Sequence, residues 1–218
     1  APSTTTSTNM AVLFSTSSND NYNSFIGNTF ANGSYNVYMR GTGTTSLEVG
    51  NVYDNNEFMD AYYQGTYLYY QDAPIFTNNR MSTSSAYTGS VYGNYFGYCE
   101  NEMIVNKNSA VVGPNNYGYG MYFTNCDGPG NSRSLISNNM ISVGNPSITS
   151  TSYGMYFTNV SRANLHNNSV FVQSGVTLSR ALYATGGGLI NSRNNNFVVD
   201  GDGYAAYYAS IYSITSSE

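Results

Sequence analysis

A short motif that recurs along the chain constrains the fold more than any other feature of the sequence. It consists of an apolar residue, a polar residue, usually two asparagines, one spacer residue and a short apolar segment. Successive copies lie 23 to 31 residues apart. The second asparagine position is filled in turn by Asn28, Asn56, Asn79, Asn108, Asn139, Asn168 and Asn195.

A second motif, rich in tyrosine and phenylalanine, lies between consecutive asparagine motifs. Two copies are nearly identical, with the sequence GMYFTN at 120–125 and at 154–159, and looser copies occur at 36–39, 67–70, 93–96, 181–184 and 205–208. Two strand-like segments that alternate at a common period predict a solenoid. A single coil cannot bury its apolar face, so we expect the coils to stack with equivalent strands ~4.8 Å apart and paired in parallel.

The asparagines have a physical role in such a stack. Asparagine tolerates the left-handed backbone that a tight turn requires, and its side-chain amide can bond the same amide one coil further along. Because an unpaired buried amide group costs about 1–3 kcal/mol, a column of mutually bonded amides removes a penalty that isolated ones would carry. We expect the seven asparagines named above to form a ladder inside the rod.

The composition favours an all-β chain. Charged residues make up only 9%, whereas the chain contains 23 Tyr, 22 Gly and 31 Asn, which suit strands and turns better than helices. The seven Lys and Arg residues are outnumbered by 12 Asp and Glu and form no cluster of the kind that nucleic-acid binding requires, so no nucleic-acid partner is expected. No apolar run is long enough to span a bilayer, so membrane insertion is not expected either.

The motif copies that contain Asn108, Asn139, Asn168 and Asn195 resemble the repeats of the right-handed parallel β-helix superfamily. This pectate-lyase-like group also includes phage tailspikes and surface adhesins. The resemblance covers roughly residues 11–212 and implies an all-β, right-handed parallel β-helix of about seven coils. We expect a flexible polar N-terminus at 1–10 and a single β-helix domain at 11–218. A β-propeller would need a period of ~40–45 residues, and a left-handed β-helix would need a hexapeptide pattern that the sequence lacks.

Two cysteines occupy the same position of neighbouring aromatic motifs. Cys99 ends the segment YFGYC, and Cys126 ends the segment YFTNC. Stacked equivalents lie ~4.8 Å apart at Cα, inside the ~4.4–6.8 Å range of disulfides. We therefore expect a Cys99–Cys126 disulfide, which would imply an oxidising compartment. The alternative is a pair of buried free thiols.

Candidate catalytic residues do not form a pattern. His166, the only histidine, stands at a position that other copies fill with Asn106, Ser137 or Arg193, so we interpret it as a polar surface residue. Resemblance to the lyases implies an Arg or Lys base and a calcium site made of Asp and Glu. The seven cations, however, fall at different positions of the repeat: Arg40, Arg80, Lys107, Arg133, Arg162, Arg180 and Arg193.

Two pairs of acids remain as candidates. Glu100 with Glu102, and Asp200 with Asp202, could act as the paired carboxylates of a glycosidase. The run Asp-Gly-Asp-Gly at 200–203 could also bind calcium, but a turn between coils is the preferred interpretation. We assign no catalytic residue, no metal and no cofactor.

The tyrosines and the rod ends carry the functional hypothesis. A tyrosine recurs in the same strand of most coils, so a column of rings is expected, and it faces either the core or the solvent. Solenoids need caps, because terminal coils expose strand edges; no cap is evident beside Val12, Leu13 and Phe14 or beside Tyr207 and Tyr208.

From these features we expect a non-enzymatic, secreted or cell-surface protein, structural or adhesive, that joins end to end into fibres. Its partner would be a second copy of itself in a head-to-tail homopolymer. The alternative is a β-helix that binds or degrades a surface polysaccharide, with outward-facing tyrosines as a platform for sugar rings.

Overall fold

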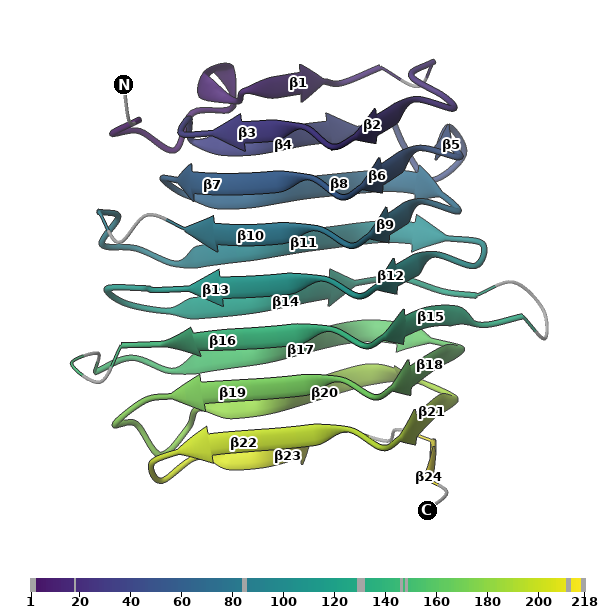
Figure 1. Ribbon diagram of the computed structural model, residues 1–218. Coiled ribbons are helices and arrows are strands. Elements are labelled where there is room, and N and C mark those ends of the chain that lie inside the picture. Colours follow the sequence, from purple (N-terminus) through teal and green to yellow (C-terminus); the bar gives the residue numbers. More distant parts are fainter. Residues whose placement is uncertain are drawn as a thin grey trace.

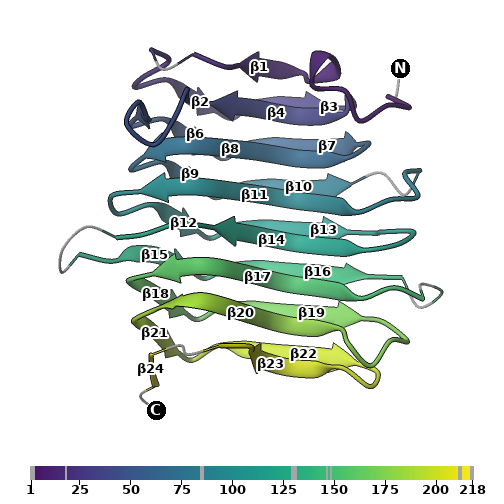
Figure 2. The ribbon, with the colours of Figure 1, turned by 180° about the vertical axis from the view of Figure 1, so that it is seen from behind.

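The chain is an all-β parallel solenoid of about seven coils, which confirms the predicted fold (Figures 1 and 2). The computed structural model describes residues 3–17, 19–83, 86–128, 132–145, 147, 149–210 and 213–216. The coils wind in a right-handed sense from one end of a rod to the other (Figure 1). Within the described ranges the one helical segment is a 3-10 turn, η1 (Thr8–Met10).

Each full coil contributes one strand to each of three parallel sheets. Sheet A runs in the order β1 (Leu13–Ser15), β4 (Tyr35–Arg40), β8 (Gln64–Asp72), β11 (Val91–Glu100), β14 (Gly118–Thr124), β17 (Ser152–Ser161), β20 (Arg180–Gly188) and β23 (Tyr204–Tyr208), with β5 (Glu48–Val49) paired to β8. Sheet B runs β2 (Ser24–Ile26), β6 (Val52–Asp54), β9 (Ile75–Thr77), β12 (Ile104–Asn106), β15 (Ser134–Ser137), β18 (Ala163–His166), β21 (Ile190–Arg193) and β24 (Ile214–Ser216). Sheet C runs β3 (Thr29–Ala31), β7 (Glu57–Ala61), β10 (Arg80–Thr83), β13 (Ser109–Val112), β16 (Met140–Gly144), β19 (Ser169–Gln173) and β22 (Asn196–Asp200).

Inward-facing side chains at equivalent positions stack into columns that fill the rod. The column of sheet A contains Leu68, Phe96, Phe123 and Phe157; that of sheet B contains Tyr53, Phe76, Val105, Ile136 and Leu165; that of sheet C contains Phe58, Met81, Ala110, Ile141 and Val170. All of these side chains are buried. Each coil therefore covers the apolar face of the next, and no coil could bury that face alone.

The predicted asparagine ladder is confirmed and lies at the turn from sheet B to sheet C. In each of the steps from Asn28 to Asn195, side-chain Nδ2 donates to Oδ1 of the next asparagine at 2.9–3.2 Å. The backbone N–H of the same residue donates to that Oδ1 at 2.9–3.1 Å. From Asn56 onward, Nδ2 also donates to a carbonyl of the preceding coil at 2.7–3.0 Å. The amides between the two end residues thus use both donors and accept two hydrogen bonds.

The left-handed turn residue is not the ladder residue. A positive φ of 51–57° occurs one residue earlier, at Asn55, Asn78, Lys107, Asn138, Asn167 and Asn194. The two properties expected of one asparagine are therefore divided between two consecutive residues. The first makes the turn, and the presence of Lys107 there indicates that this position needs no amide. The second carries the buried hydrogen bonds.

A column of glycines explains the glycine that begins the aromatic motif. At Gly65, Gly93, Gly120 and Gly154 an added Cβ would lie only 2.4–2.7 Å from the carbonyl oxygen at the equivalent position of the next coil. The alternation of inward and outward residues is interrupted here without a shift in register: Gly120 and Met121 are both buried, whereas Tyr119 and Tyr122 on either side of them are partly exposed. Only glycine permits this approach of one backbone to the next.

We expect Gly120→Ala to lower the free energy of unfolding by about 3 kcal/mol, because overpacking a rigid core forces the backbone to shift. The new Cβ would meet Ile141 Cγ2 at 2.4 Å and the Gly154 carbonyl oxygen at 2.6 Å. Gly113→Ala is the matched control, since its Cβ would have no neighbour within 4 Å, and a change within about 0.5 kcal/mol is expected there. Denaturant unfolding of both variants measures the difference. Equal stabilities would contradict the close backbone approach.

Candidate functional site

A column of aromatic rings covers the outer face of sheet A, the face turned toward the viewer in Figure 2. The strand register aligns one ring per coil: Phe14, Tyr38, Tyr67, Tyr95, Tyr122, Tyr156, Tyr183 and Tyr207. Met121 and Phe123, on either side of Tyr122, are fully buried, and Tyr122 itself is partly exposed. The column therefore lies on the outer side of sheet A. Its tyrosines from Tyr67 to Tyr183 are partly exposed, whereas Tyr38 is buried. We call these eight residues the first column.

The rings of the first column stack face to face along the rod. Centroids of neighbouring tyrosines from Tyr38 to Tyr183 lie 4.7–5.0 Å apart. The ring planes differ by only 8° at Tyr38–Tyr67, Tyr95–Tyr122 and Tyr122–Tyr156. Offset stacking of this kind contributes about 0.5–1.5 kcal/mol for each pair.

A second column runs beside the first. Tyr92, Tyr119 and Tyr153 stand in register with Arg180 and Tyr204. Tyr119 stacks on Tyr92 at 4.6 Å and on Tyr153 at 5.2 Å. Arg180 takes the place of a ring, and its guanidinium carbon lies 4.6 Å from the centroid of Tyr207, a cation–π contact.

The two columns meet edge to face. The Tyr119 and Tyr122 centroids are 5.6 Å apart at 71°, and those of Tyr153 and Tyr156 are 4.8 Å apart at 89°. Burial, reinforced by the neighbouring tyrosines, raises the pKa of Tyr92 and of Tyr156 to about 12. These phenols therefore stay protonated at neutral pH.

The stacking decides what the tyrosine face can bind. Because each ring covers the faces of its neighbours, the surface presents ring edges. A sugar ring that stacks on an aromatic side chain needs an open ring face. Among the described residues of the first column, the terminal rings offer one: Phe14 is 48% exposed and Tyr207 is 37% exposed, and each has a column neighbour on one side only.

The predicted assembly residues lie at the two ends of the rod. Val12 and Phe14 are exposed at the N-terminal end, whereas Leu13 is partly buried against the core. At the C-terminal end Tyr207 faces outward, while Tyr208 stands in register with Ala184 of the buried column. Within the described ranges, β1, β2 and β3 at one end and β22, β23 and β24 at the other pair with a neighbour on one side only.

The charges differ between the two halves of the rod. Residues 1–102 contain eight acids and two bases, a net charge of −6, whereas residues 103–218 contain four acids and five bases, a net charge of +1. The N-terminal half is therefore strongly negative, and the C-terminal half is nearly neutral. A contact between unlike ends avoids the repulsion of two negative halves.

The candidate catalytic residues are not brought together. His166 is on the outer face of sheet B in register with Ser137 and Arg193, and burial, together with Arg193, lowers its pKa. Glu102 is exposed in the turn after β11, which ends at Glu100. The stretch 200–203 forms the turn between β22 and β23. Across the described ranges no three His, Cys, Asp or Glu residues are grouped closely enough to hold a metal ion.

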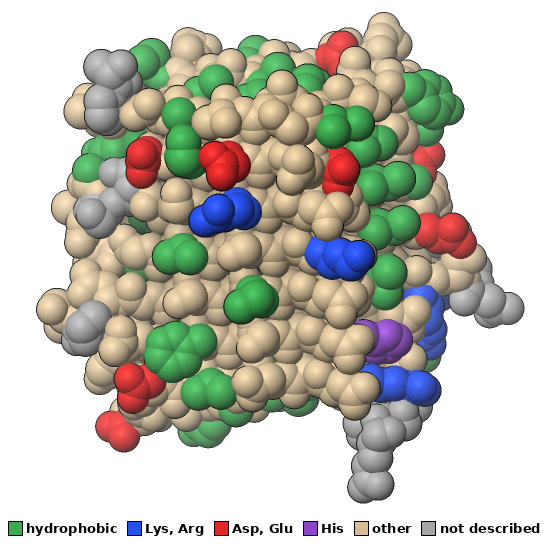
Figure 3. Space-filling view, viewed as in Figure 1, with side chains coloured by type: hydrophobic (Ala, Val, Ile, Leu, Met, Phe, Trp, Pro, Cys, Tyr) green, Lys and Arg blue, Asp and Glu red, His purple; other side chains and the backbone are tan. Residues whose placement is uncertain are grey.

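The cations make separate contacts. Arg162 bonds Asp127 at 2.9 Å, Arg133 donates to the Leu189 carbonyl, and the Arg40 guanidinium lies over the rings of Tyr69 and Tyr70. Figure 3 shows the charged side chains of sheets B and C standing singly or in pairs.

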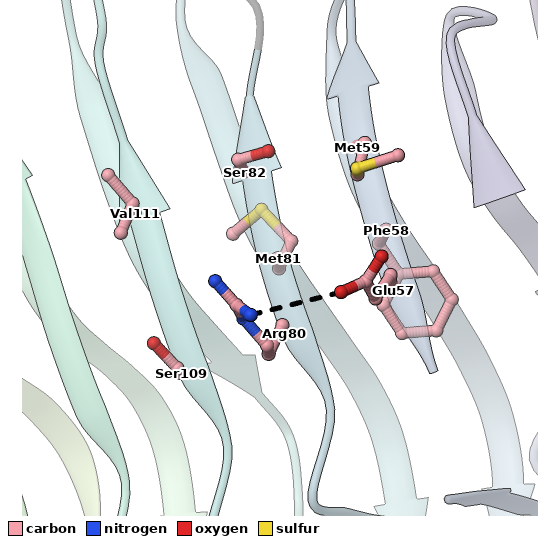
Figure 4. Close-up of a pocket in the computed structure, with 8 residues that line it drawn as sticks. All are labelled: Glu57, Phe58, Met59, Arg80, Met81, Ser82, Ser109 and Val111. Atoms are coloured by element: carbon pink, nitrogen blue, oxygen red, sulfur yellow. Dashed lines mark ion pairs between the residues drawn. The ribbon is translucent and has the colours of Figure 1, made fainter. Parts of the chain in front are cut away.

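A shallow hollow of about 110 Å³ crosses the outer face of sheet C (Figure 4). Its lining includes Glu57, Arg80 and Ser109, in register on neighbouring strands. Arg80 Nη1 lies 3.9 Å from Glu57 Oε1, and both side chains are largely exposed, so the ion pair contributes little to stability. The hollow contains a single carboxylate, which cannot by itself supply the acid pair that hydrolyses a glycoside.

A buried carboxylate that the repeat did not predict lies inside the rod. Glu48 is on β5, in register with Gln71 of β8, and is fully buried. Its Oε2 accepts hydrogen bonds from Gln71 Nε2 at 2.5 Å and from Asn51 Nδ2 at 3.4 Å, whereas Oε1 has no partner among the described residues. Burial raises the pKa of Glu48 to about 7, although the hydrogen bond from Gln71 opposes this shift.

The raised pKa of Glu48 predicts a pH dependence of stability. The pKa of Glu48 is ordinarily 4.5 and is about 7 in the folded protein. The stabilisation from Glu48 is therefore fully present below pH 4.5 and is lost as the pH rises through 7. At pH 8 we expect Glu48→Gln to unfold with a free energy about 3 kcal/mol higher than the wild type, and near pH 4 this gain should vanish. Glu102→Gln, at an exposed position, is the control and should follow the wild type. A constant difference across the pH range for Glu48→Gln would contradict the prediction.

The expected Cys99–Cys126 disulfide is wrong: both cysteines are buried free thiols. They stand at equivalent positions, so their side chains run side by side instead of toward each other. Cys99 Sγ donates to the Leu68 carbonyl and Cys126 Sγ donates to the Phe96 carbonyl, each at 3.5 Å in the preceding coil. Burial raises the pKa of the Cys99 thiol, and the inference of an oxidising compartment loses its support.

We expect neither thiol to react with a maleimide reagent in the folded protein, because both cysteines are buried and the reagent cannot reach the sulfur atoms. In denaturant without reductant, two thiols per chain should be labelled. Mass spectrometry of the labelled chain counts them. A single labelled thiol, or none, in the denatured and unreduced chain would contradict this assignment.

Comparison with protein-family models, with curated proteins and with solved structures gives no match for this chain. In the ranges that the structure describes, no helix is long and apolar enough to cross a membrane.

Proposed function

We propose that this chain is a structural or adhesive protein of the cell exterior whose rods join head to tail into fibres. One observation carries the proposal: within the described residues, the terminal strands at both ends have a parallel neighbour on one side only, and their side chains belong to the same columns. The extracellular location rests on the composition and on the resemblance to the pectate-lyase-like superfamily, since the free cysteines give it no support.

The proposed joint continues two sheets directly. If β23 of one copy pairs with β1 of the next, Tyr207 stacks on Phe14 and extends the first column, and Ala206 meets Leu13 in the inward column of Met121 and Met155. In the same joint β24 of one copy pairs with β2 of the next. Sheet C is one strand shorter, so the joint leaves space there for one more extended segment.

Head-to-tail contacts of this kind do not close. The surface at one end differs from the surface at the other, so the contact is heterologous and each added copy presents a fresh end. Unpaired strand edges supply the main-chain hydrogen bonds, as they do between coils within one copy.

Electron microscopy of the purified chain tests the proposal. Fibres are expected, many times longer than a single rod of ~35 Å, which is seven coils at ~4.8 Å each. Incubation with polygalacturonate, alginate and pectin, with and without calcium, should yield no new unsaturated or reducing ends. Single rods at every concentration, together with turnover abolished by replacing one Arg or Asp, would favour the polysaccharide-active alternative.

A further inference from the structure

The two tyrosine columns hold many phenols at fixed, short distances on a solvent-facing surface. Tyr95, Tyr122 and Tyr156 follow one another at 4.8 Å between centroids in the first column, and Tyr92, Tyr119 and Tyr153 follow at 4.6 and 5.2 Å in the second. The rings are partly exposed. The stacking covers the ring faces, so the exposed part of each ring lies at its edge.

We propose that the outer face of sheet A is a site of oxidative tyrosine coupling, in which a peroxidase-type one-electron oxidant joins tyrosines of neighbouring coils through carbon–carbon bonds. The inference depends on the geometry of one rod and not on the assembly of rods into fibres. The proposed coupling needs neither an exposed ring face nor a catalytic group of this chain.

The coupling reaction consists of oxidation, radical coupling and a shift of hydrogen. Each of two phenols loses one electron and its hydroxyl proton, which gives two phenoxyl radicals. The radicals couple at their ortho carbons, and each ortho hydrogen then moves to oxygen to restore a phenol. The net loss is two electrons and two protons. One hydrogen peroxide accepts them and becomes two water molecules.

Proximity makes coupling within a rod faster than coupling between molecules. Radicals in solution must meet by diffusion, whereas neighbouring rings of a column are already in contact, and such intramolecular reactions have very high effective molarities. Tyr22 gives the contrast within the same chain. It is 76% exposed, yet it has no ring neighbour within the described ranges, so it is accessible to the oxidant but has no partner in reach.

Tryptic cleavage separates the coils conveniently. The peptide 81–107 contains Tyr92 and Tyr95, 108–133 contains Tyr119 and Tyr122, and 134–162 contains the next pair. After treatment of dilute folded protein with horseradish peroxidase and hydrogen peroxide, we expect 108–133 to be joined to 81–107 and to 134–162. Each joined pair should have lost two hydrogens. The yield per chain should not change on dilution.

Paired variants test the assignment. Tyr119→Phe with Tyr122→Phe keeps the rings but removes the phenols, so both joined products of 108–133 should disappear, while a product of Tyr156 with Tyr183 in 181–193 remains. Tyr22→Phe is the control, because Tyr22 is highly exposed and lies outside the columns; it should leave every product unchanged. Circular dichroism confirms that each variant is folded.

Three results would overturn the inference. The first is the absence of dityrosine in the oxidised wild type. The second is persistence of the joined products in the Tyr119 and Tyr122 variant, or their loss in the control. The third is a yield that rises in proportion to protein concentration, since that dependence belongs to coupling between molecules.

Discussion

Asn168→Leu is expected to lower the free energy of unfolding by several kcal/mol. The Asn168 amide accepts two hydrogen bonds from Asn139 and donates to Asn195 Oδ1 and to the Ile136 carbonyl, each at 2.9–3.1 Å. Leucine would leave these partners unpaired in the core, at about 1–3 kcal/mol for each group that finds no substitute. Thermal or urea unfolding measures the change.

Asn167→Gly is the control for this variant because the two residues are consecutive but differ in role. Asn167 is exposed and has a φ of 55°, a conformation that glycine adopts without strain. We expect its stability to stay within about 0.5 kcal/mol of the wild type. If both variants lost the same stability, the division between a turn residue and a ladder residue would be wrong.

Ala206→Lys is expected to weaken end-to-end association at least ~100-fold, because an unpaired ammonium buried at the joint costs several kcal/mol and each 1.4 kcal/mol is a factor of ten. Ala206 is exposed at the open end of a column that is buried in the preceding coils, at Leu182 and Met155. The monomer should therefore tolerate the lysine. Sedimentation velocity over a concentration series measures association.

Tyr207→Lys is the neighbouring comparison. Tyr207 belongs to the first column on the outer face of sheet A, so a lysine there can extend into solvent. We expect end-to-end association to weaken less than with Ala206→Lys, because only the ring stack on Phe14 of the next copy is lost. Equal elongation of both variants and the wild type would show that fibres form through another surface.

The ladder could be predicted because its chemistry repeats once per coil. A buried amide is paired only if another asparagine occupies the same position of the next coil, so the regular spacing of Asn108, Asn139 and Asn168 indicates the ladder. The outward direction of the tyrosines followed in part from alternation with Met121 and Phe123. It stayed open because tyrosine is suited to both core and surface positions.

Other features could not be predicted for identifiable reasons. Gly120 and Gly154 were visible in the motif, but sequence periodicity does not reveal that the backbone of the next coil lies too close for a Cβ at these positions. Glu48 occurs once, outside the repeat, and its burial depends on how β5 pairs with β8. The prediction of a Cys99–Cys126 disulfide was wrong because it rested on Cα spacing alone. In parallel stacked strands every pair of equivalent residues has that spacing, whatever the direction of the side chains.

Fibre diffraction from aligned filaments tests the head-to-tail account most directly. If the coils of successive copies form one continuous stack, the strands lie across the fibre, and the ~4.8 Å spacing of parallel neighbours falls along the fibre axis. The account predicts a sharp meridional reflection at ~4.8 Å. Filaments that place this reflection on the equator would have grown by side-to-side contact of rods, and they would contradict the proposed joint.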